Sequence, residues 1–205
     1  AAGAILVEDP FAGTDFASYR QVTPGTPFFD GRGLESIAYD MTCYLKRLGE
    51  SAAVKTWDEF AEATHIEEVT GKGTILGYLH ELPDFVEAIK SPGTPPAMPQ
   101  FVELKRRYLD ILKEVFDRHN LDGLVYPQMI EELPELHSGD AIRETTVGEL
   151  NIAGLPAVTV PAGYYNSGAP FELIFLGQKW SEPELIQQAY AYEQSTLHRK
   201  AADLS

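Results

Sequence analysis

The fold is decided by NIAGLPAVTVPAG, residues 151–163, which reads as a turn, a strand and a second turn. Gly154 and Pro156 interrupt the chain before the strand, and Pro161 and Gly163 follow it. The run 157–160 combines apolar and β-branched side chains, which is typical of a strand covered on both faces. Such a strand needs other strands beside it and helices over it, so the neighbouring segments must supply them.

The segments on either side of this stretch alternate between helical and extended patterns. Apolar residues from 101 to 115 recur at helical spacing and predict a long amphipathic helix that ends near Asn120. A turn at 121–123 then precedes a short buried strand at 124–126. After residue 163, a turn at 164–170 and a strand at 171–176 predict a hairpin. A capping box that begins at Ser181 opens the final helix. The predicted fold class is α/β, with a partial mixed sheet flanked by helices.

The first hundred residues give weaker signals. Residues 4–7 read as a buried strand, and the spacing over 34–48 predicts a helix. Thr56 begins a capping box for a short helix, and a further helix over 76–89 is interrupted or restarted at Pro83. The Pro-rich connector at 91–99 is the best candidate boundary between two halves.

Composition excludes several classes of partner. The net charge of −15 argues against nucleic acid and anionic membranes, because both favour positively charged proteins. No apolar run reaches the ~18 residues of a membrane span. Cys43 is the only cysteine, so no intramolecular disulfide can form. Cys43 is expected to be buried in a helix, and the chain is expected to be cytoplasmic.

Three stretches resemble functional motifs, but in each the residue pattern favours an ordinary structural role. Gly71-Lys72 lacks the glycine spacing of a phosphate loop and the Ser or Thr that should follow the lysine. The acidic loop 128–148 has no ligand pair at helical or hairpin spacing, so no metal or other cofactor is expected. Ser51 and Lys55 could meet as a nucleophile and base only on a helix, and Gly49 favours a loop there. The five histidines are isolated along the chain.

The second half resembles the C-terminal portion of amidase-signature hydrolases. The resemblance rests on DGLVYP at 122–127, the stretch at 151–163, the hairpin at 168–177 and AYEQST at 191–196, in this order. It implies two domains: 1–100 as a variable middle region of helices and loops that could cover a substrate pocket, and 101–205 as a C-terminal α/β segment with the hairpin and final helix. It also implies part of an amidase-signature fold.

This resemblance implies hydrolysis of carboxamide C–N bonds through a Ser acyl-enzyme, with a second Ser and a Lys that relays protons. The Gly/Ser-rich motif that carries those serines in the family does not occur in this sequence. We therefore expect no catalytic residue in this chain, inactivity of the chain alone, and catalytic residues in polypeptide upstream of it.

The resemblance places substrate-facing groups after the strand that ends at Pro127. Gln128, which stands where the family usually has Thr, Met129 and Asn151 are the pocket candidates, against a plain role as loop and turn residues. A small amide would be the substrate. The alternatives are a non-catalytic binding module, or an oligomerisation domain that could form a homodimer.

Overall fold

The computed structural model describes residues 3–16, 36–66, 83–135, 137, 138, 140 and 148–201. The prediction for Gly71-Lys72 and the part of the predicted 76–89 helix that precedes Pro83 lie outside the described residues. The chain forms two compact units: Ala1–Phe16 with Arg106–Ser205, and Ala17–Lys105. The assignment of 1–100 and 101–205 to two regions of an amidase remains a prediction.

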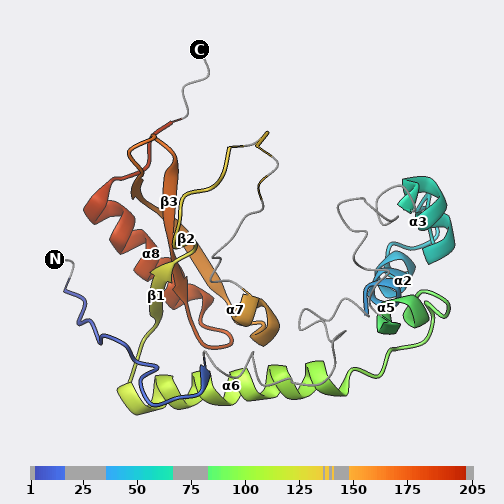
Figure 1. The fold of residues 1–205 in the computed structure, drawn as a ribbon, viewed down its shortest axis with the longest axis horizontal. Helices are drawn as coiled ribbons and strands as arrows, with labels where there is room; N and C mark the ends of the chain where they lie inside the picture. Colours follow the sequence, from blue (N-terminus) through green and yellow to red (C-terminus); the bar gives the residue numbers. More distant parts are fainter. Residues whose placement is uncertain are drawn as a thin grey trace. The chain divides into compact units, whose positions relative to one another are not determined.

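A three-stranded sheet is the centre of the first unit (Figure 1). Its strands are β1 (Leu124–Pro127), β2 (Ala157–Tyr164) and β3 (Pro170–Leu176), in the order β1-β3-β2. Both pairs are antiparallel. The turn between β2 and β3 is closed by the Tyr165 N–H, which donates to the Ala169 carbonyl oxygen at 2.8 Å. The predicted hairpin and the predicted sheet flanked by helices are confirmed.

Helix α8 (Glu182–Thr196) packs against one face of this sheet, mainly over β2. Leu185 and Ala189 of α8 are buried against Val160 of β2 and Phe175 of β3. The predicted capping box is wrong, because the Ser181 hydroxyl donates to the Gln178 carbonyl at 2.7 Å instead of capping α8. The helix itself is confirmed.

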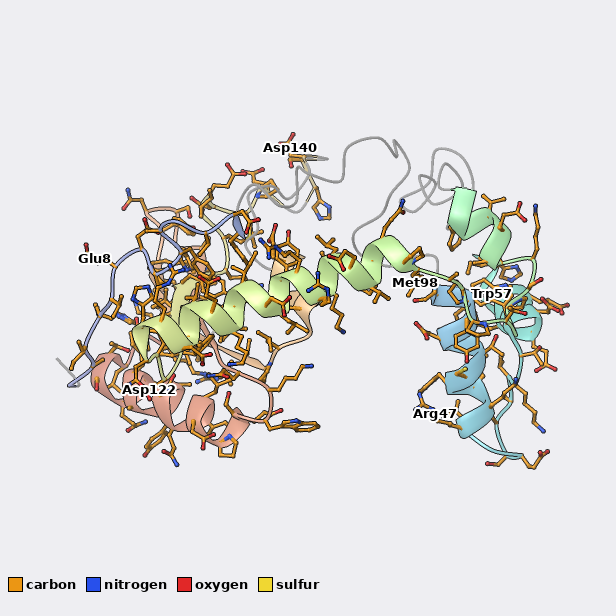
Figure 2. The ribbon with its side chains drawn as sticks, turned by 90° about the horizontal axis from the view of Figure 1, so that it is seen from below. Glu8, Arg47, Trp57, Met98, Asp122 and Asp140 are labelled. Atoms are coloured by element: carbon orange, nitrogen blue, oxygen red, sulfur yellow. The ribbon has the colours of Figure 1, made fainter. Side chains whose placement is uncertain are left out.

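The long helix α6 (Pro99–His119) is also confirmed. Tyr108, Leu112 and Val115 on its apolar stripe are almost fully buried. Figure 2 shows α6 and places Asp122 near its end, in the turn that leads into β1. The N-terminal segment is fixed to α6, because Arg107 pairs with Asp15 at 2.8 Å and the Phe16 ring meets the edge of Tyr108. The hydrogen bond from the Arg107 guanidinium lowers the pKa of Asp15.

The second unit contains helices α2 (Ile37–Arg47), α3 (Trp57–Thr64) and α5 (Pro83–Ala88). Helix α3 begins as predicted, because the Thr56 hydroxyl accepts the Glu59 N–H at 3.2 Å. The Glu59 carboxylate in turn accepts a hydrogen bond from the Lys55 N–H at 2.7 Å. Cys43 lies in a helix as expected, α2, but its side chain is only half-buried, so the expected burial is found only in part.

Two expectations about buried strands are also wrong. Residues 4–7 form no strand, and Ile5 and Leu6 are 93% and 83% exposed. In β2, Val160 is buried but Ala157 and Thr159 are exposed, so β2 is covered on one face only. Both expectations depend on apolar sequence alone, whereas burial depends on what packs against the segment.

Candidate functional site

The predicted pocket residues lie on two elements of the first unit. Gln128 and Met129 follow directly after β1 and are half-buried. The Gln128 N–H donates to the Glu172 carbonyl at 3.2 Å, which extends the ladder between β1 and β3 by one position. The Gln128 backbone is thus fixed by the sheet, while its side chain lies beyond the strand end.

Asn151 lies in the short helix α7 (Gly148–Ala153), not in a turn as expected. Its neighbours Leu150 and Ile152 are buried, whereas Asn151 is exposed. Gly154 ends α7 with a positive φ of 69°, and its N–H donates to the Leu150 carbonyl at 2.8 Å. The structure therefore brings Gln128 and Met129 together and places Asn151 on a separate element.

Tyr126 is a candidate that the sequence reasoning missed. Its phenolic oxygen is buried and has no hydrogen-bond partner among the described residues. Burial raises the pKa of Tyr126, and the carboxylate of Glu149 in α7 raises it further. The end of β1 and the first turn of α7 therefore interact electrostatically through these two side chains. The sequence contains a signal for this burial, because side chains alternate along a strand and Tyr126 therefore faces away from the exposed Val125.

Serine chemistry of the amidase type has no support among the described residues. The hydroxyls of Ser36 and Ser167 donate to carboxylates, and those of Ser181 and Ser195 donate to backbone carbonyls. Ser51 and Lys55 lie outside any helix, and Lys55 Nζ pairs with Glu50 at 3.0 Å.

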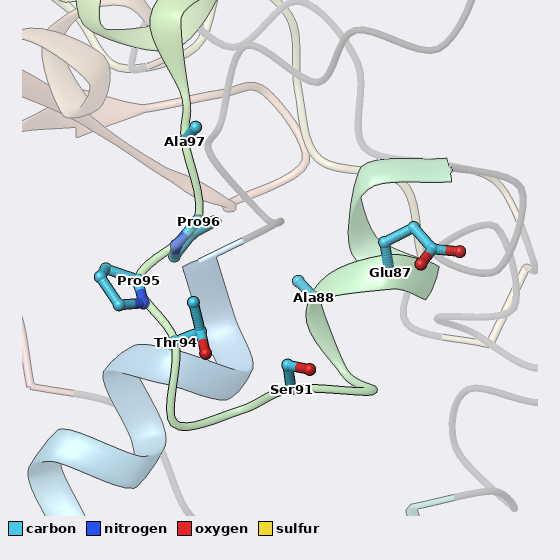
Figure 3. A pocket seen from close by; sticks show the side chains of 7 residues that line it. All are labelled: Glu87, Ala88, Ser91, Thr94, Pro95, Pro96 and Ala97. Carbon is cyan, nitrogen blue, oxygen red and sulfur yellow. The ribbon is translucent and has the colours of Figure 1, made fainter.

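A hollow of about 300 Å³ lies in the second unit, between α5 and the Pro-rich connector (Figure 3). Its lining includes the Ser91 and Thr94 hydroxyls and the Glu87 carboxylate, with small or proline side chains around them. Glu87 already pairs with Lys90 at 2.6 Å, and no histidine or lysine is found among the described residues that line the hollow. The described lining residues therefore provide no nucleophile with an adjacent base.

Metal ligands and membrane-spanning helices are also missing from the described part of the chain. The described residues hold no group of His, Cys, Asp or Glu that could bind a metal ion. None of the described helices is long and apolar enough to cross a membrane.

The sequence is similar to known amidases and to subunits of an amidotransferase. It is 46% identical to a probable amidase of Arabidopsis thaliana over 76 residues, which is 35% of this chain and 14% of that protein. It is 33% identical to a glutamyl-tRNA(Gln) amidotransferase subunit of Methanococcoides burtonii over 101 residues, or 44% of this chain and 21% of that protein. No protein-family model matches the sequence.

Solved structures give the same result for the fold. A peptide amidase in complex with the competitive inhibitor chymostatin is 26% identical, with a TM-score of 0.58 over 82% of this chain. The native peptide amidase of Stenotrophomonas maltophilia matches 91% of this chain in fold, with a TM-score of 0.58 at 24% identity. This chain covers about a third of those structures, 34% and 35%. The chain is therefore similar to amidases in sequence and in fold, and it matches a part of each of them.

Proposed function

We propose that this chain is the C-terminal part of an amidase that hydrolyses carboxamide C–N bonds through a Ser acyl-enzyme. In this proposal the serine nucleophile, the second serine and the lysine lie in polypeptide upstream of this chain. The 46% identity to a probable amidase is the observation that supports the proposal most strongly. The hydroxyls of Ser36, Ser167, Ser181 and Ser195 are bonded to carboxylates or carbonyls, which fits a nucleophile located elsewhere.

The proposed contribution of this chain is part of the wall of a substrate pocket. Gln128 and Met129 follow a strand end that is fixed by the sheet, so their positions are well suited to orient a bound amide. The carboxamide of Gln128 can both donate and accept hydrogen bonds, as an amide substrate requires. Asn151 offers the same chemistry from α7.

The test is hydrolysis of a peptide amide, measured as ammonia release. We expect no turnover by the 205-residue chain alone. We expect turnover when the chain is joined to the part of the Stenotrophomonas maltophilia peptide amidase that it does not match. Turnover by the isolated chain that is abolished by Ser51→Ala would contradict the proposal. As a control in the same assay, Gln187→Ala changes a residue on the exposed side of α8 and should leave turnover by the joined protein unchanged.

A non-catalytic oligomerisation or binding domain is the second candidate, because large apolar side chains are exposed in the described part of the chain. Ile5, Leu6 and Trp180 are each more than 80% exposed, at 93%, 83% and 87%. This candidate predicts a stable homodimer or a captured ligand without any amidase activity in the joined protein. Sedimentation of the chain alone would reveal such a dimer.

A further inference from the structure

The sheet has a second face, which lies opposite the face that packs against α8. Val160 of β2 and Phe175 of β3 pack against α8. Because side chains alternate along a strand, the alternate residues of each strand point to the second face. The register places Tyr126, Ile174 and Thr159 in one row on this second face. Ile174 is buried and Thr159 is exposed, so the second face is covered over β3 and open over β2.

Glu172 lies directly opposite Gln128 on the second face. Gln128 follows Tyr126 by two positions, and its N–H donates to the Glu172 carbonyl at 3.2 Å. This bond continues the pairing of Tyr126 with Ile174 to the next pair on the same face. Directly opposed residues of antiparallel strands have Cβ atoms about 5 Å apart. The Glu172 side chain therefore stands beside that of Gln128, a pocket candidate.

The Glu172 side chain is half-buried, and its carboxylate has no partner in the described part of the chain. Glu172 lies on the central strand β3, with a strand on each side. No Lys, Arg or His of the described residues forms an ion pair with it. Withdrawing a carboxylate from water costs free energy unless a cation or a hydrogen-bond donor compensates. A cationic group at this place would supply that compensation.

The Tyr126 hydroxyl is a second polar group on this face. Its oxygen is buried and has no hydrogen-bond partner among the described residues. Tyr126 and Glu172 are diagonal neighbours across β1 and β3, and such neighbours lie about 7–8 Å apart. The carboxylate of Glu149 in α7 adds negative charge close to Tyr126. Tyr126, Gln128 and Glu172 can all accept hydrogen bonds, so together they suit a ligand rich in donors.

We propose that Glu172 is a specificity-determining residue that selects amides carrying a protonated amine. The inference rests on the proposed function and adds the class of substrate side group. The Glu172 carboxylate accepts charge-assisted hydrogen bonds from the ammonium group, while the Gln128 carboxamide beside it binds the substrate amide. The net charge of −15 also attracts cationic molecules to the chain.

The experiment uses the protein that joins this chain to the unmatched part of the Stenotrophomonas maltophilia peptide amidase. The substrates are N-acetyl-lysinamide and N-acetyl-norleucinamide, which differ only in the charged amino group. We expect kcat/KM to be about tenfold or more higher for the lysine amide, because charge-assisted hydrogen bonds are strong. Glu172→Gln should abolish this preference by raising KM for the lysine amide alone.

Glu184→Gln is the matched control. It removes the same charge from an exposed position of α8 and should leave the preference unchanged. An equal loss of preference in both variants would assign the effect to overall charge and overturn the inference. Circular dichroism confirms that each variant folds.

The outcomes separate this inference from the proposed function. Turnover of both amides without a preference, or with a preference that Glu172→Gln leaves intact, overturns the inference and leaves the function standing. An equal loss on both amides in Glu172→Gln assigns Glu172 a structural role and overturns the inference as well.

A joined protein without turnover contradicts the proposed function, and calorimetry then gives the dissociation constants of the two amides. Tighter binding of the lysine amide that Glu172→Gln abolishes supports the inference. Equal binding of the two amides, or no binding of either, overturns it.

Discussion

At the scale of single residues, Gly177 shows how closely the chain packs between β3 and α8. A Cβ at this position would lie 2.0 Å from Ser181 Oγ and 3.1 Å from Leu185 Cδ1. We expect Gly177→Ala to lower the free energy of unfolding by about 1–3 kcal/mol, because the added methyl group would crowd Leu185, which is fully buried. Urea denaturation measures the change.

Gly93→Ala is the matched control for that substitution. A Cβ at Gly93 would meet no heavy atom within 4 Å, so the stability should change by less than about 0.5 kcal/mol. Equal effects of the two substitutions would show that crowding at Gly177 is not the cause.

Tyr126 gives a prediction about pH. Burial, with Glu149, raises the pKa of its phenol above the ordinary value of 10.0, so the unfolded chain loses the proton first as pH rises. Its contribution to stability is present below pH 10 and is lost as pH rises above it. Tyr126→Phe should therefore show a smaller loss of stability above pH 10 in urea denaturation. It should be neutral or slightly stabilising at pH 7, because it removes a buried hydroxyl that has no hydrogen-bond partner among the described residues.

Tyr190→Phe is the comparison, since the Tyr190 side chain is 62% exposed. If Tyr126→Phe loses as much stability above pH 10 as the unsubstituted chain does, the loss does not come from Tyr126. Local sequence could have identified this residue from the alternation of side chains in β1. The approach of Glu149 could not be read from sequence, because Glu149 belongs to a different element.

At the scale of elements, two neighbours on α8 should differ sharply in their effect on stability. Leu185 is fully buried in the core with Val160 and Phe175, whereas Ile186 is 60% exposed. Leu185→Ala should cost about 2–5 kcal/mol, because it removes packed side-chain atoms and leaves a cavity. Ile186→Ala should cost less than about 0.5 kcal/mol in the isolated chain. Thermal and urea denaturation of both variants measure the difference. A large loss of stability in Ile186→Ala would mean that the Ile186 side chain is already covered in the isolated chain.

The existence of most elements could be predicted from sequence, because their signals are local. The stripe of α6, the hairpin of β2 and β3 and the cap at Thr56 each depend on residues within one segment. Burial could not be predicted equally well. The apolar run at 4–7 has the pattern of a core strand yet is exposed, and β2 has one exposed face. Both depend on what other elements lie against them.

At the scale of the whole molecule, the candidate site could be located only in part. The order of motifs points to amidases, and the relatives and solved structures agree. The position of Asn151 in a helix could not be predicted, because Gly154 and Pro156 have the pattern of a turn and in fact follow the end of α7. The roles of Gln128, Met129 and Asn151 remain predictions, since they concern a pocket that this chain would only partly line.

The role of Gln128 can be tested in the protein that joins this chain to the unmatched part of the peptide amidase. If its carboxamide orients the substrate, Gln128→Ala should raise KM about threefold to tenfold and change kcat little, because it removes an interaction that the ground state and transition state share. Gln128→Glu should also raise KM, since a carboxylate cannot donate to the substrate carbonyl. Gln187→Ala, on the exposed side of α8, should change neither constant. A fall in kcat without a change in KM would instead place Gln128 among groups that act only in the transition state, and unchanged kinetics would assign it a structural role beyond β1.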